Sequence, residues 1–543
     1  MIVPSLPIRA LATLLLGSLL VGFAHIALLP PFEGFDETGH FAYIQQVATT
    51  GHWPVRGDPM SRDIDDYLAV APTAESMHGP WTYPSFFRAD ATVIERGQQA
   101  IHQPPAAPRG FTRGQIGNWQ AQHPPLYYFA LAPAYRISEG WGLGAQLFLL
   151  RAISYLLAWG GLCVALIAAV KSAVRNERIA TVLPLGIALW PAIFPMWFPE
   201  MARLGNDSLI AIFAACTFIL ICRIAAEGTL REYALLGLTL GLALLTKATF
   251  LPVTAAAFLL LALLIWLART VPDLLYRRIK GLIVCVAVTA AVSAWWYVTK
   301  FLETGTFIGS NDDAVLKSTG GLIAALSKNA DVLSLVRSPF AMAESFLWGG
   351  TWSFVLPSRV TVLPIAVMVA IIGYGGYRYL RKHGPNLGDG FVLLTLVLFT
   401  IALLQHTLVL LALIGSPAPA WYLHSLAPIL ALLVGYGLAD AMSRPWLRGA
   451  LSVLLVYAPV FLVGATLLNV LFFAGCAPLL PGRRYFSRAD ATACLADLPR
   501  MRANLSVLAA PDLGVVLFLA GSLLLVIGAI LAVRHRASIT STR

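Results

Sequence analysis

Long apolar runs separated by short polar connections dominate the pattern of this chain. Most runs hold about 20 residues, the length of a helix that crosses a bilayer. We identify about twelve of them, at residues 8–29, 148–170, 179–198, 207–225, 232–247, 250–268, 281–299, 360–377, 391–413, 421–441, 449–472 and 513–533. The stretch 232–268 is too long for one span, so we interpret it as a hairpin of two helices rather than one broken helix. The pattern predicts an all-α polytopic integral membrane protein.

Composition agrees with this pattern and adds an orientation. The 543 residues are 58% hydrophobic and 12% charged, whereas soluble domains carry about 25% charged residues. The net charge of +11 is concentrated in short connections, which the positive-inside rule predicts to be cytoplasmic. Both termini are then cytoplasmic, the first run is an uncleaved anchor, and no nucleic-acid partner is needed. The basic connections lie around Arg9, Lys171–Arg178, Arg223–Arg231, Arg269–Lys280, Arg378–Lys382, Arg444–Arg448 and Arg534–Arg543.

Three long segments are predicted on the opposite, outer side: residues 30–142, 300–357 and 474–512. The first follows the first run directly. Near its start, apolar residues recur at helical spacing and predict a short amphipathic helix on the membrane surface that ends near Gly51. Residues 58–117 are rich in Pro, Gly and charge, and we expect this stretch to include mobile loop. The stretch ESFLWGGTWSFVLP in the second segment predicts a short interfacial helix.

The six cysteines divide into two sets. Cys476 and Cys494 share the third outer segment, where an oxidising compartment favours a disulfide between them. The alternative is two free thiols. The other four lie within predicted spans and are expected to pack as small apolar groups. No metal-binding cysteine spacing and no phosphate-binding loop motif is found in the sequence.

Two adjacent acids follow the first run, in the segment Pro30–His40, PPFEGFDETGH. Asp36 and His40 would share one face of a helix that begins near Phe35. Asp36 and Glu37 could simply cap that helix, since acids favour the first turn. One acid suffices for a cap, however, and carboxylates beside lipid are costly. We therefore favour a general base, or a divalent metal (Mg or Mn) bound by Asp36 and His40.

Two further polar features lie at predicted outer turns. The turn Glu200–Asp207 reads EMARLGND, and it would bring Arg203 near a phosphate and Asp207 near a substrate hydroxyl. The alternative is that Asn206 and Asp207 cap the following helix. Lys247, in GLALLTKATFLP, is expected at the outer end of the hairpin. It either snorkels to the interface or supplies positive charge to a ligand anion.

Two aromatic stretches containing histidine lie near the same boundary, HPPLYY at His123–Tyr128 and PAWYLHSLAP at Pro419–Pro428. His123, Tyr127 and His424 are candidate substrate contacts. The alternatives are packed interfacial belts and, for His424, a satisfied helix histidine. Proton acceptors, cations and aromatic surfaces would thus gather at the outer leaflet. This combination suits transfer of a sugar from a lipid phosphate.

Taken in order, these motifs resemble the GT-C glycosyltransferase superfamily, polytopic enzymes that use sugars on polyprenyl or dolichyl phosphate. The resemblance covers roughly residues 8–310. The DETGH form looks most like a bacterial branch of largely uncharacterised members, with protein O-mannosyltransferases and lipid A aminoarabinose transferases as more distant relatives. The motifs are Asp36–Glu37, HPPLYY, Arg151 in LLRAIS, the GND of residues 205–207, GLALLTK and WWYVTK.

The resemblance implies roles for individual residues. Asp36 would be the catalytic base or a metal ligand, with Glu37 second. Cations on outer loops would hold the lipid phosphate, which points to Arg203 and Lys247 and more weakly to Lys300. Two departures are evident. Many relatives carry an arginine before tyrosine in a late helix where this chain has Trp421, and because the third outer segment, 474–512, is short, we expect no large soluble C-terminal domain.

We therefore expect residues 1–310 to form a GT-C-like catalytic membrane module, and 311–543 to supply further transmembrane helices. The hypothesis is transfer of a sugar, with inversion, from a polyprenyl-monophosphate donor to a hydroxyl of a glycan, lipid or protein at the periplasmic face of a bacterial inner membrane. One alternative is an O-antigen ligase or polymerase, although those place their main outer loop late in the chain. Another is a secondary transporter, which would show paired repeats and charges at mid-membrane.

Overall fold

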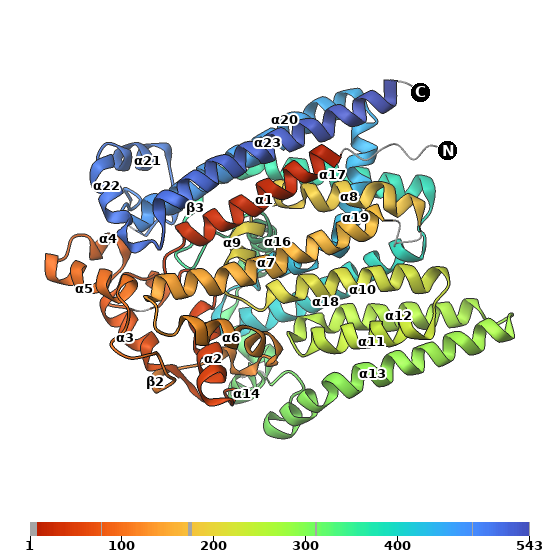
Figure 1. The fold of residues 1–543 in the computed structure, drawn as a ribbon, viewed down its shortest axis with the longest axis horizontal. Helices are drawn as coiled ribbons and strands as arrows, with labels where there is room; N and C mark the ends of the chain where they lie inside the picture. Colours follow the sequence, from red (N-terminus) through yellow and green to blue (C-terminus); the bar gives the residue numbers. More distant parts are fainter. Residues whose placement is uncertain (1–7, 78, 172–175, 310–311, 481, 542–543) are drawn as a thin grey trace.

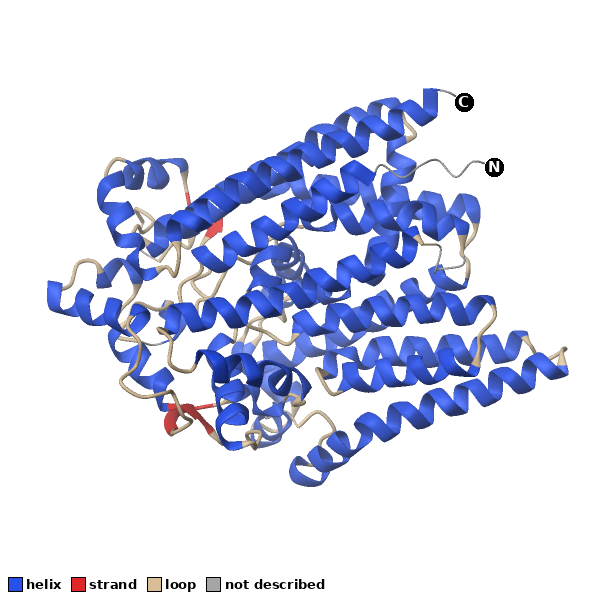
Figure 2. Ribbon diagram, in the orientation of Figure 1, coloured by secondary structure: helices blue, strands red, loops and turns tan. Residues whose placement is uncertain are grey.

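The computed structural model describes residues 8–77, 79–171, 176–309, 312–480 and 482–541. Most of this part of the chain is helical, and its strands are short (Figure 2). The chain termini, 1–7 and 542–543, for which a cytoplasmic position is predicted, lie outside the described residues.

Within the described residues, ten helical segments are long and apolar enough to cross a membrane. The prediction of an all-α polytopic membrane protein is therefore confirmed. Two of the twelve predicted spans form shorter helices, α8 (Glu177–Ile193) and α11 (Leu230–Leu244). The ten are α1 (Ile8–Leu28), α7 (Leu143–Val170), α10 (Asp207–Ala226), η3 (Ala248–Phe250) with α12 (Leu251–Leu267), α13 (Pro272–Thr304), α17 (Arg359–His383), α18 (Leu387–Ile414), η4 (Ala420–Leu426) with α19 (Ala427–Met442), α20 (Pro445–Phe473) and α23 (Pro511–Ser541).

The predicted run 179–198 is interrupted before its end. Phe194, which precedes Pro195, has φ −117° and ψ 86°, because a proline disfavours the helical conformation of the residue before it. The chain resumes in the short helix α9 (Trp197–Ala202). The break therefore detaches the segment that carries Glu200 and leads to Arg203.

The stretch 232–268 folds as the expected hairpin. Helix α11 ends near one end of α13, where the Tyr297 hydroxyl donates to the carbonyl of Leu244 at 2.9 Å. Helix α12 returns to the other end, where Arg278 donates to the carbonyl of Leu264 at 2.5 Å. The turn between the two helices contains Lys247.

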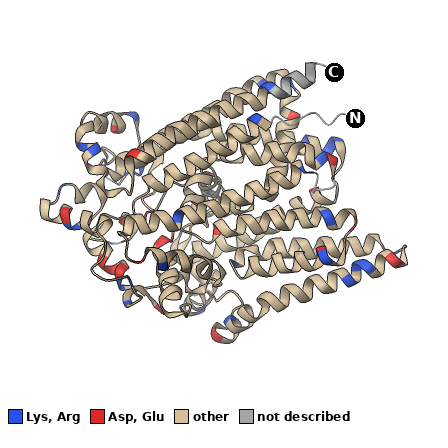
Figure 3. Cartoon of the chain, viewed as in Figure 1, with Lys and Arg blue, Asp and Glu red and all other residues tan. Residues whose placement is uncertain are grey.

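The long helices run roughly side by side (Figure 1). Helix α1 packs along α23 through glycine, because a Cβ atom on Gly17 would lie 2.9 Å from the backbone nitrogen of Leu525. Such close backbone approach is typical of membrane helix pairs. We call the end of the bundle that carries residues 29–142 the loop end. Figure 3 shows Lys and Arg on helix ends opposite to it.

Residues 29–142 form a folded layer at the loop end. Within 58–117, where some mobile loop is expected, helices and a two-stranded antiparallel sheet pack around buried side chains such as Met60, Ile64 and Phe86, and residues 103–112 run without helix or strand. The elements are α2 (Glu37–Thr50), β1 (Pro59–Ser61), α3 (Arg62–Val70), η1 (Glu75–Met77), α4 (Tyr83–Phe86), α5 (Ala91–His102), β2 (Arg113–Gly117), η2 (Trp119–Gln122) and α6 (Leu126–Ser138).

Helix α2 is the predicted short helix after the acidic pair, and it ends at Thr50 before Gly51, whose φ is 74°. Its environment differs from the expectation of a surface helix. Every side chain from Glu37 to Val47 is buried, because α6 and η2 pack against it. Some polar side chains on α2 are paired inside the protein, as where Gln45 donates to Asp63 Oδ2 at 2.6 Å.

The second and third outer segments join this layer. Strand β3 (Leu356–Pro357) pairs in parallel with β4 (Tyr485–Phe486), and Gln98 of α5 donates to the Ser506 hydroxyl at 2.7 Å. Cys476 and Cys494 are joined by a disulfide with a Cα–Cα distance of 5.9 Å. The remaining elements are α14 (Asp312–Ser318), α15 (Leu322–Asn329), α16 (Val332–Leu347), α21 (Arg488–Leu495), α22 (Leu498–Asn504) and η5 (Leu505–Val507).

The predicted interfacial helix over ESFLWGGTWSFVLP is largely wrong. Helix α16 ends at Leu347, and residues 348–355 run as a loop without helix. Gly349 and Gly350 favour this termination, and Gly350 has φ 70°, a conformation that glycine adopts without steric cost.

Candidate active site

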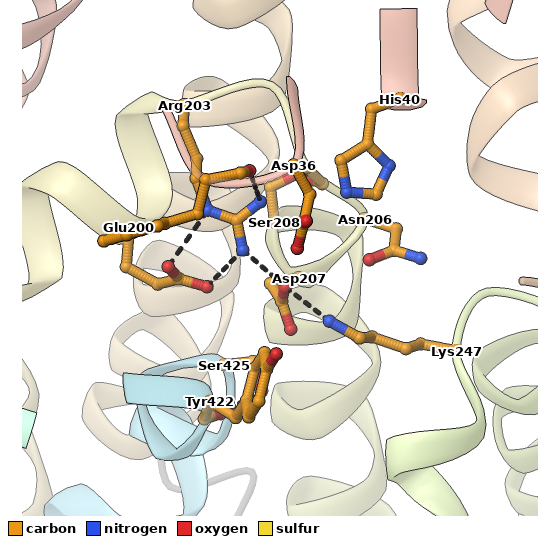
Figure 4. A network of polar contacts seen from close by, with 12 residues as sticks. Asp36, His40, Glu200, Arg203, Asn206, Asp207, Ser208, Lys247, Tyr422 and Ser425 are labelled. Carbon is orange, nitrogen blue, oxygen red and sulfur yellow. Dashed lines mark hydrogen bonds and ion pairs between the residues drawn. The ribbon is translucent and has the colours of Figure 1, made fainter. Parts of the chain in front are cut away.

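Segments distant in sequence converge at the loop end in one network of polar contacts (Figure 4). The turn after α1 supplies Asp36, and α2 supplies His40. The segment from α9 to α10 supplies Glu200, Arg203 and Asp207. The turn before α12 supplies Lys247 and η4 supplies Tyr422. The predicted gathering of acids, cations and an aromatic residue is thus present.

Asp36 occupies the N-cap position of α2 without acting as a cap. Its backbone is left-handed, with φ 61°, and its side chain makes no capping hydrogen bond. Instead Oδ1 accepts a hydrogen bond from Nε1 of Trp119 at 2.8 Å. Within the described residues Oδ2 accepts none, and the side chain is half-buried. Asp36 therefore offers one carboxylate oxygen to a ligand.

Glu37 is buried and fully paired. Arg151 of α7 donates to Oε1 at 2.8 Å and to Oε2 at 2.5 Å. The backbone N–H of Leu204 donates to Oε1 at 2.8 Å, and that of Gly34 to Oε2 at 3.0 Å. A Cβ atom on Gly34 would lie 2.5 Å from Cδ of Glu37, so glycine is needed for this approach. These contacts lock Glu37 between α2, α7 and the turn before α10.

Arg203 is also held inside the protein. Its guanidinium donates to both oxygens of Glu200, at 2.6 and 3.0 Å. It also donates to the carbonyl of Phe35 at 3.0 Å and to Asp207 Oδ2 at 3.0 Å. Burial raises the pKa of the Glu200 carboxyl, and Arg203 opposes this by favouring the carboxylate. Arg203 therefore fixes the backbone beside Asp36, and each of its three guanidinium nitrogens donates a hydrogen bond.

Lys247 continues this chain of ion pairs. Its Nζ donates to Asp207 Oδ2 at 2.6 Å and lies 4.7 Å from the ring centroid of Tyr422. Asp207 Oδ1 and Asn206 Oδ1 are buried and have no hydrogen-bond partner among the described residues. Both residues border the space that Asp36, His40 and Lys247 surround in Figure 4. Unpaired buried acceptors call for an explanation, and a ligand with donor groups would provide one.

His40 and His123 lie together behind this space. Their ring centroids are 6.2 Å apart, and His40 Nδ1 is 3.0 Å from the Tyr128 hydroxyl. Burial lowers the pKa of His40 well below its ordinary value, helped by Arg203. Burial likewise lowers the pKa of His123 to about 3. Both rings are neutral near pH 7. Tyr127 hydrogen-bonds Ser154 at 2.6 Å, a contact that joins α6 to α7.

Lys300 and His424, two of the predicted site residues, form contacts outside the network. Lys300 donates to Glu303 at 2.9 Å and lies over the Trp296 ring, and no described contact joins it to the network. His424 is stacked on Phe346 and bonded to its carbonyl at 3.0 Å, and Trp190 donates to its Nδ1 at 3.3 Å. These contacts agree with the alternative of a satisfied helix histidine.

The described residues do not form a complete metal site. No group of three or more His, Cys, Asp or Glu side chains in this part of the chain is arranged to hold an ion. His40 Nδ1 is already paired with Tyr128. A metal bound by Asp36 and His40 stays a prediction, and no chemical step is derived from it.

Four members of the site region were not predicted from the sequence. Glu200 could have been found, because it stands three residues before Arg203 on a helix, a spacing that favours ion pairs. Glu33 lies in the same PPFEGFDETGH segment as Asp36, but no pattern in that segment predicts the residues that Glu33 contacts. Trp119 and Trp352 come from distant loops and carry no local signal.

Backbone strain is concentrated in the same place. Among the described non-glycine residues, positive φ angles occur at Phe32 (62°), Asp36 (61°) and Phe354 (48°). Phe35 contacts Phe354 with a ring separation of 5.6 Å. Strained backbone of this kind persists only where surrounding contacts enforce it, and it clusters at functional sites.

Solved structures of similar arrangement include the following three. ArnT from Cupriavidus metallidurans bound to undecaprenyl phosphate has 16% identity and a TM-score of 0.41, over 94% of this chain and 76% of that one. Arabinosyltransferase EmbB from Mycobacterium smegmatis has 13% identity and a TM-score of 0.39, over 95% and 41%. Archaeal oligosaccharyltransferase AglB from Archaeoglobus fulgidus, in complex with an inhibitory peptide and a dolichol-phosphate, has 13% identity and a TM-score of 0.30. The match covers 93% of this chain and 56% of that one.

This chain spans about half the length of the last two proteins. Because every TM-score is low, the function of this chain is inferred from its own residues. No curated protein matches the sequence. Residues 19–419 match the family model described as "Predicted membrane protein (DUF2142)", which is well over half of the chain. The chain therefore belongs to the DUF2142 family.

Proposed function

We propose that this protein is a membrane glycosyltransferase that moves a sugar from a polyprenyl-monophosphate donor to an acceptor hydroxyl. The observation that carries the proposal is the half-buried Asp36, with one carboxylate oxygen free of partners among the described residues, beside a buried cluster of two cations. A carboxylate of this kind can accept a proton, and the cations can stabilise a phosphate leaving group.

The phosphate contact is assigned to Lys247 ahead of Arg203. The Lys247 ammonium has three donors, and its hydrogen bond within the described part of the chain is the one to Asp207. The remaining donors can reach a phosphate without breaking that pair. Arg203 donates to Glu200, Asp207 and Phe35, so phosphate binding there would break existing bonds. Arg203 contributes positive charge and rigidity instead.

The proposed reaction is a single displacement. Asp36 takes the proton of the acceptor hydroxyl while that oxygen forms a bond to the anomeric carbon. The bond from the anomeric carbon to the phosphate oxygen breaks, and polyprenyl phosphate leaves with the bonding electrons. Attack from the face opposite the phosphate inverts the anomeric configuration. Positioning and charge stabilisation in a site shielded from water supply the rate enhancement.

Other residues of the network support this chemistry. Asp207 and Asn206 offer unpaired oxygens to sugar hydroxyls. Glu37 is a positioning residue, because its oxygens are occupied by Arg151 and two backbone N–H groups. His40 and His123 are neutral and border the site, which suits hydrogen bonding to a neutral sugar.

The proposal includes a location. The donor would enter from the bilayer, and the site would face the periplasm of a bacterial inner membrane, because the short connections at the end of the bundle away from the site carry Lys and Arg with few acids (Figure 3). A secondary transporter would depend on an ion gradient, whereas a transferase consumes donor without one. Purified protein in detergent, which holds no gradient, discriminates the two.

The test is loss of turnover in Asp36→Asn. Purified protein is given a panel of undecaprenyl-phosphate sugars together with host envelope extract as the acceptor source, and release of undecaprenyl phosphate is measured. We expect the variant to lose about 100-fold or more of the rate. Asp66→Asn, at a carboxylate 68% exposed, is the matched control and keeps the rate. Unchanged turnover in Asp36→Asn would refute the assignment of the base.

A further inference from the structure

The loop at residues 348–355, called here the tryptophan loop, contacts the turn that carries Asp36. Hydrogen bonds to the buried acid Glu33, which has no role in the proposed reaction, hold the loop in place. Glu33 Oε1 accepts from the Thr351 hydroxyl at 2.8 Å and from the Ser353 N–H at 2.7 Å. The Glu33 carbonyl accepts from the Trp352 N–H at 3.0 Å. Glu33 Oε2 accepts from the Tyr83 hydroxyl at 3.0 Å.

Glu33 is 1% exposed and has no cationic partner among the described residues. Burying a carboxylate is costly unless its oxygens are satisfied by hydrogen bonds. Three donors satisfy this one, and two of them belong to the tryptophan loop. The conformation of the loop therefore depends on Glu33.

Aromatic side chains of the loop and of the turn at Asp36 pack together, and we call this cluster of Phe35, Trp352, Phe354 and Trp421 the aromatic wall. Phe35, the residue before Asp36, is stacked on Trp421 at a ring separation of 4.1 Å and contacts Trp352 at 5.4 Å. Phe354 lies 5.6 Å from Phe35 on the same cluster. The loop approaches closely, since a Cβ atom on Gly349 would lie 2.8 Å from the Trp421 ring.

The wall contains polar groups without partners in the described part of the chain. Nε1 of Trp352, Nε1 of Trp421 and the hydroxyl of Ser353 are buried and make no hydrogen bond there. Trp421 as a whole is 7% exposed. A buried indole N–H normally finds an acceptor. Aromatic faces combined with unpaired donors match a sugar ring, which has apolar C–H faces and hydroxyl oxygens.

We propose that the tryptophan loop forms the subsite for the donor sugar and that Glu33 is the positioning residue that holds the loop in place. This inference rests on the proposed function. The donor is favoured over the acceptor because the wall continues to Tyr422, which packs in the same cluster. The Tyr422 ring lies under Lys247 at 4.7 Å, so a sugar linked to a phosphate on Lys247 reaches the wall.

The first test compares two ligands on Trp352→Ala. Binding of undecaprenyl phosphate, which has no sugar, and of an undecaprenyl-phosphate sugar accepted by the wild type is measured on purified protein. We expect the sugar-bearing ligand to bind about 10-fold more weakly and undecaprenyl phosphate to bind unchanged. Trp446→Ala, at a tryptophan 71% exposed, leaves both affinities unchanged. Equal weakening for both ligands, or no weakening, overturns the subsite.

The second test uses two substitutions of Glu33. A glutamine can keep all three contacts, because its oxygen accepts from Thr351 and Ser353 and its amide donates to the Tyr83 oxygen. Glu33→Gln should therefore keep KM for the donor and kcat, whereas Glu33→Ala raises KM by about 10-fold. Loss of turnover in Glu33→Gln would identify a catalytic acid and overturn the positioning role, as would an unchanged KM in Glu33→Ala.

Different results would contradict the proposed function and the donor-sugar subsite. If the wild type releases no polyprenyl phosphate from any donor of the panel, the proposed function fails. If the wild type is active and Trp352→Ala changes the KM for acceptor but not for donor, the function stands and the donor-sugar assignment fails.

Discussion

Asp36 and Glu37 are adjacent, yet their environments differ completely. Asp36 is half-buried with one oxygen bonded to Trp119, whereas Glu37 is buried with both oxygens used by Arg151 and backbone N–H groups. A carboxylate that is already saturated with donors is a poor proton acceptor. The same reasoning separates Lys247, which keeps donors for a ligand, from Arg203, which does not.

Lys247→Gln should weaken phosphate binding without unfolding the site. The glutamine amide can still donate to Asp207, but the positive charge is lost. We expect undecaprenyl phosphate to bind about 10-fold to 100-fold more weakly, because hydrogen bonds to charged groups contribute about 1.5–3 kcal/mol. The measurement is a binding isotherm on purified protein.

Lys300→Gln is the matched control for that measurement. Lys300 pairs with Glu303 outside the network, so its loss should leave the affinity unchanged. If Lys300→Gln weakens binding and Lys247→Gln does not, the phosphate contact is assigned to the wrong lysine.

At the scale of elements, the Glu37–Arg151 pair joins α2 to α7. Arg151 also donates to the carbonyls of Leu29 and Pro30 at the end of α1, at 2.6 and 2.7 Å. The Leu204 N–H adds the turn before α10. One buried ion pair thus holds the elements that present Asp36, Arg203 and Asp207 in a common frame.

Glu37→Gln should destabilise the protein, in contrast to Asp36→Asn. The substitution leaves the Arg151 guanidinium buried without its counter-charge, and breaking a buried pair costs about 3–5 kcal/mol. We expect the thermal unfolding midpoint in detergent to fall clearly for Glu37→Gln and to change little for Asp36→Asn. Equal midpoints for the two variants would contradict the anchoring role of Glu37.

At the scale of the whole molecule, three segments far apart in sequence build one layer at the loop end. The β3–β4 pair, the Glu33 contacts and the Gln98–Ser506 bond link residues 29–142 to the second and third outer segments. The site lies at the loop end of the bundle, and the opposite end carries Lys and Arg on the short connections between helices (Figure 3).

The proposed orientation predicts which residues an impermeant reagent can reach. Arg96→Cys in α5 should react with a membrane-impermeant maleimide on intact spheroplasts, because exposed α5 belongs to the loop end. Lys280→Cys, exposed near the other end of α13, should react only after permeabilisation. The reverse pattern would place the site on the cytoplasmic side.

The membrane helices, the hairpin and the acidic pair after α1 could all be predicted from the amino-acid sequence. Apolar run length and helical spacing are local properties, so they can be recognised in the sequence without knowing the fold. The ranking of Asp36 above Glu37 followed from family resemblance and stays a prediction; in the structure Asp36 is bonded through Oδ1 to Trp119, whereas both Glu37 oxygens are paired. Four features became visible only in the folded chain: α2 is buried, Arg203 is paired, Lys300 and His424 are paired elsewhere, and Glu33 holds the tryptophan loop. Each of these depends on partners up to some 320 residues away, and charge or spacing within one segment cannot specify such partners.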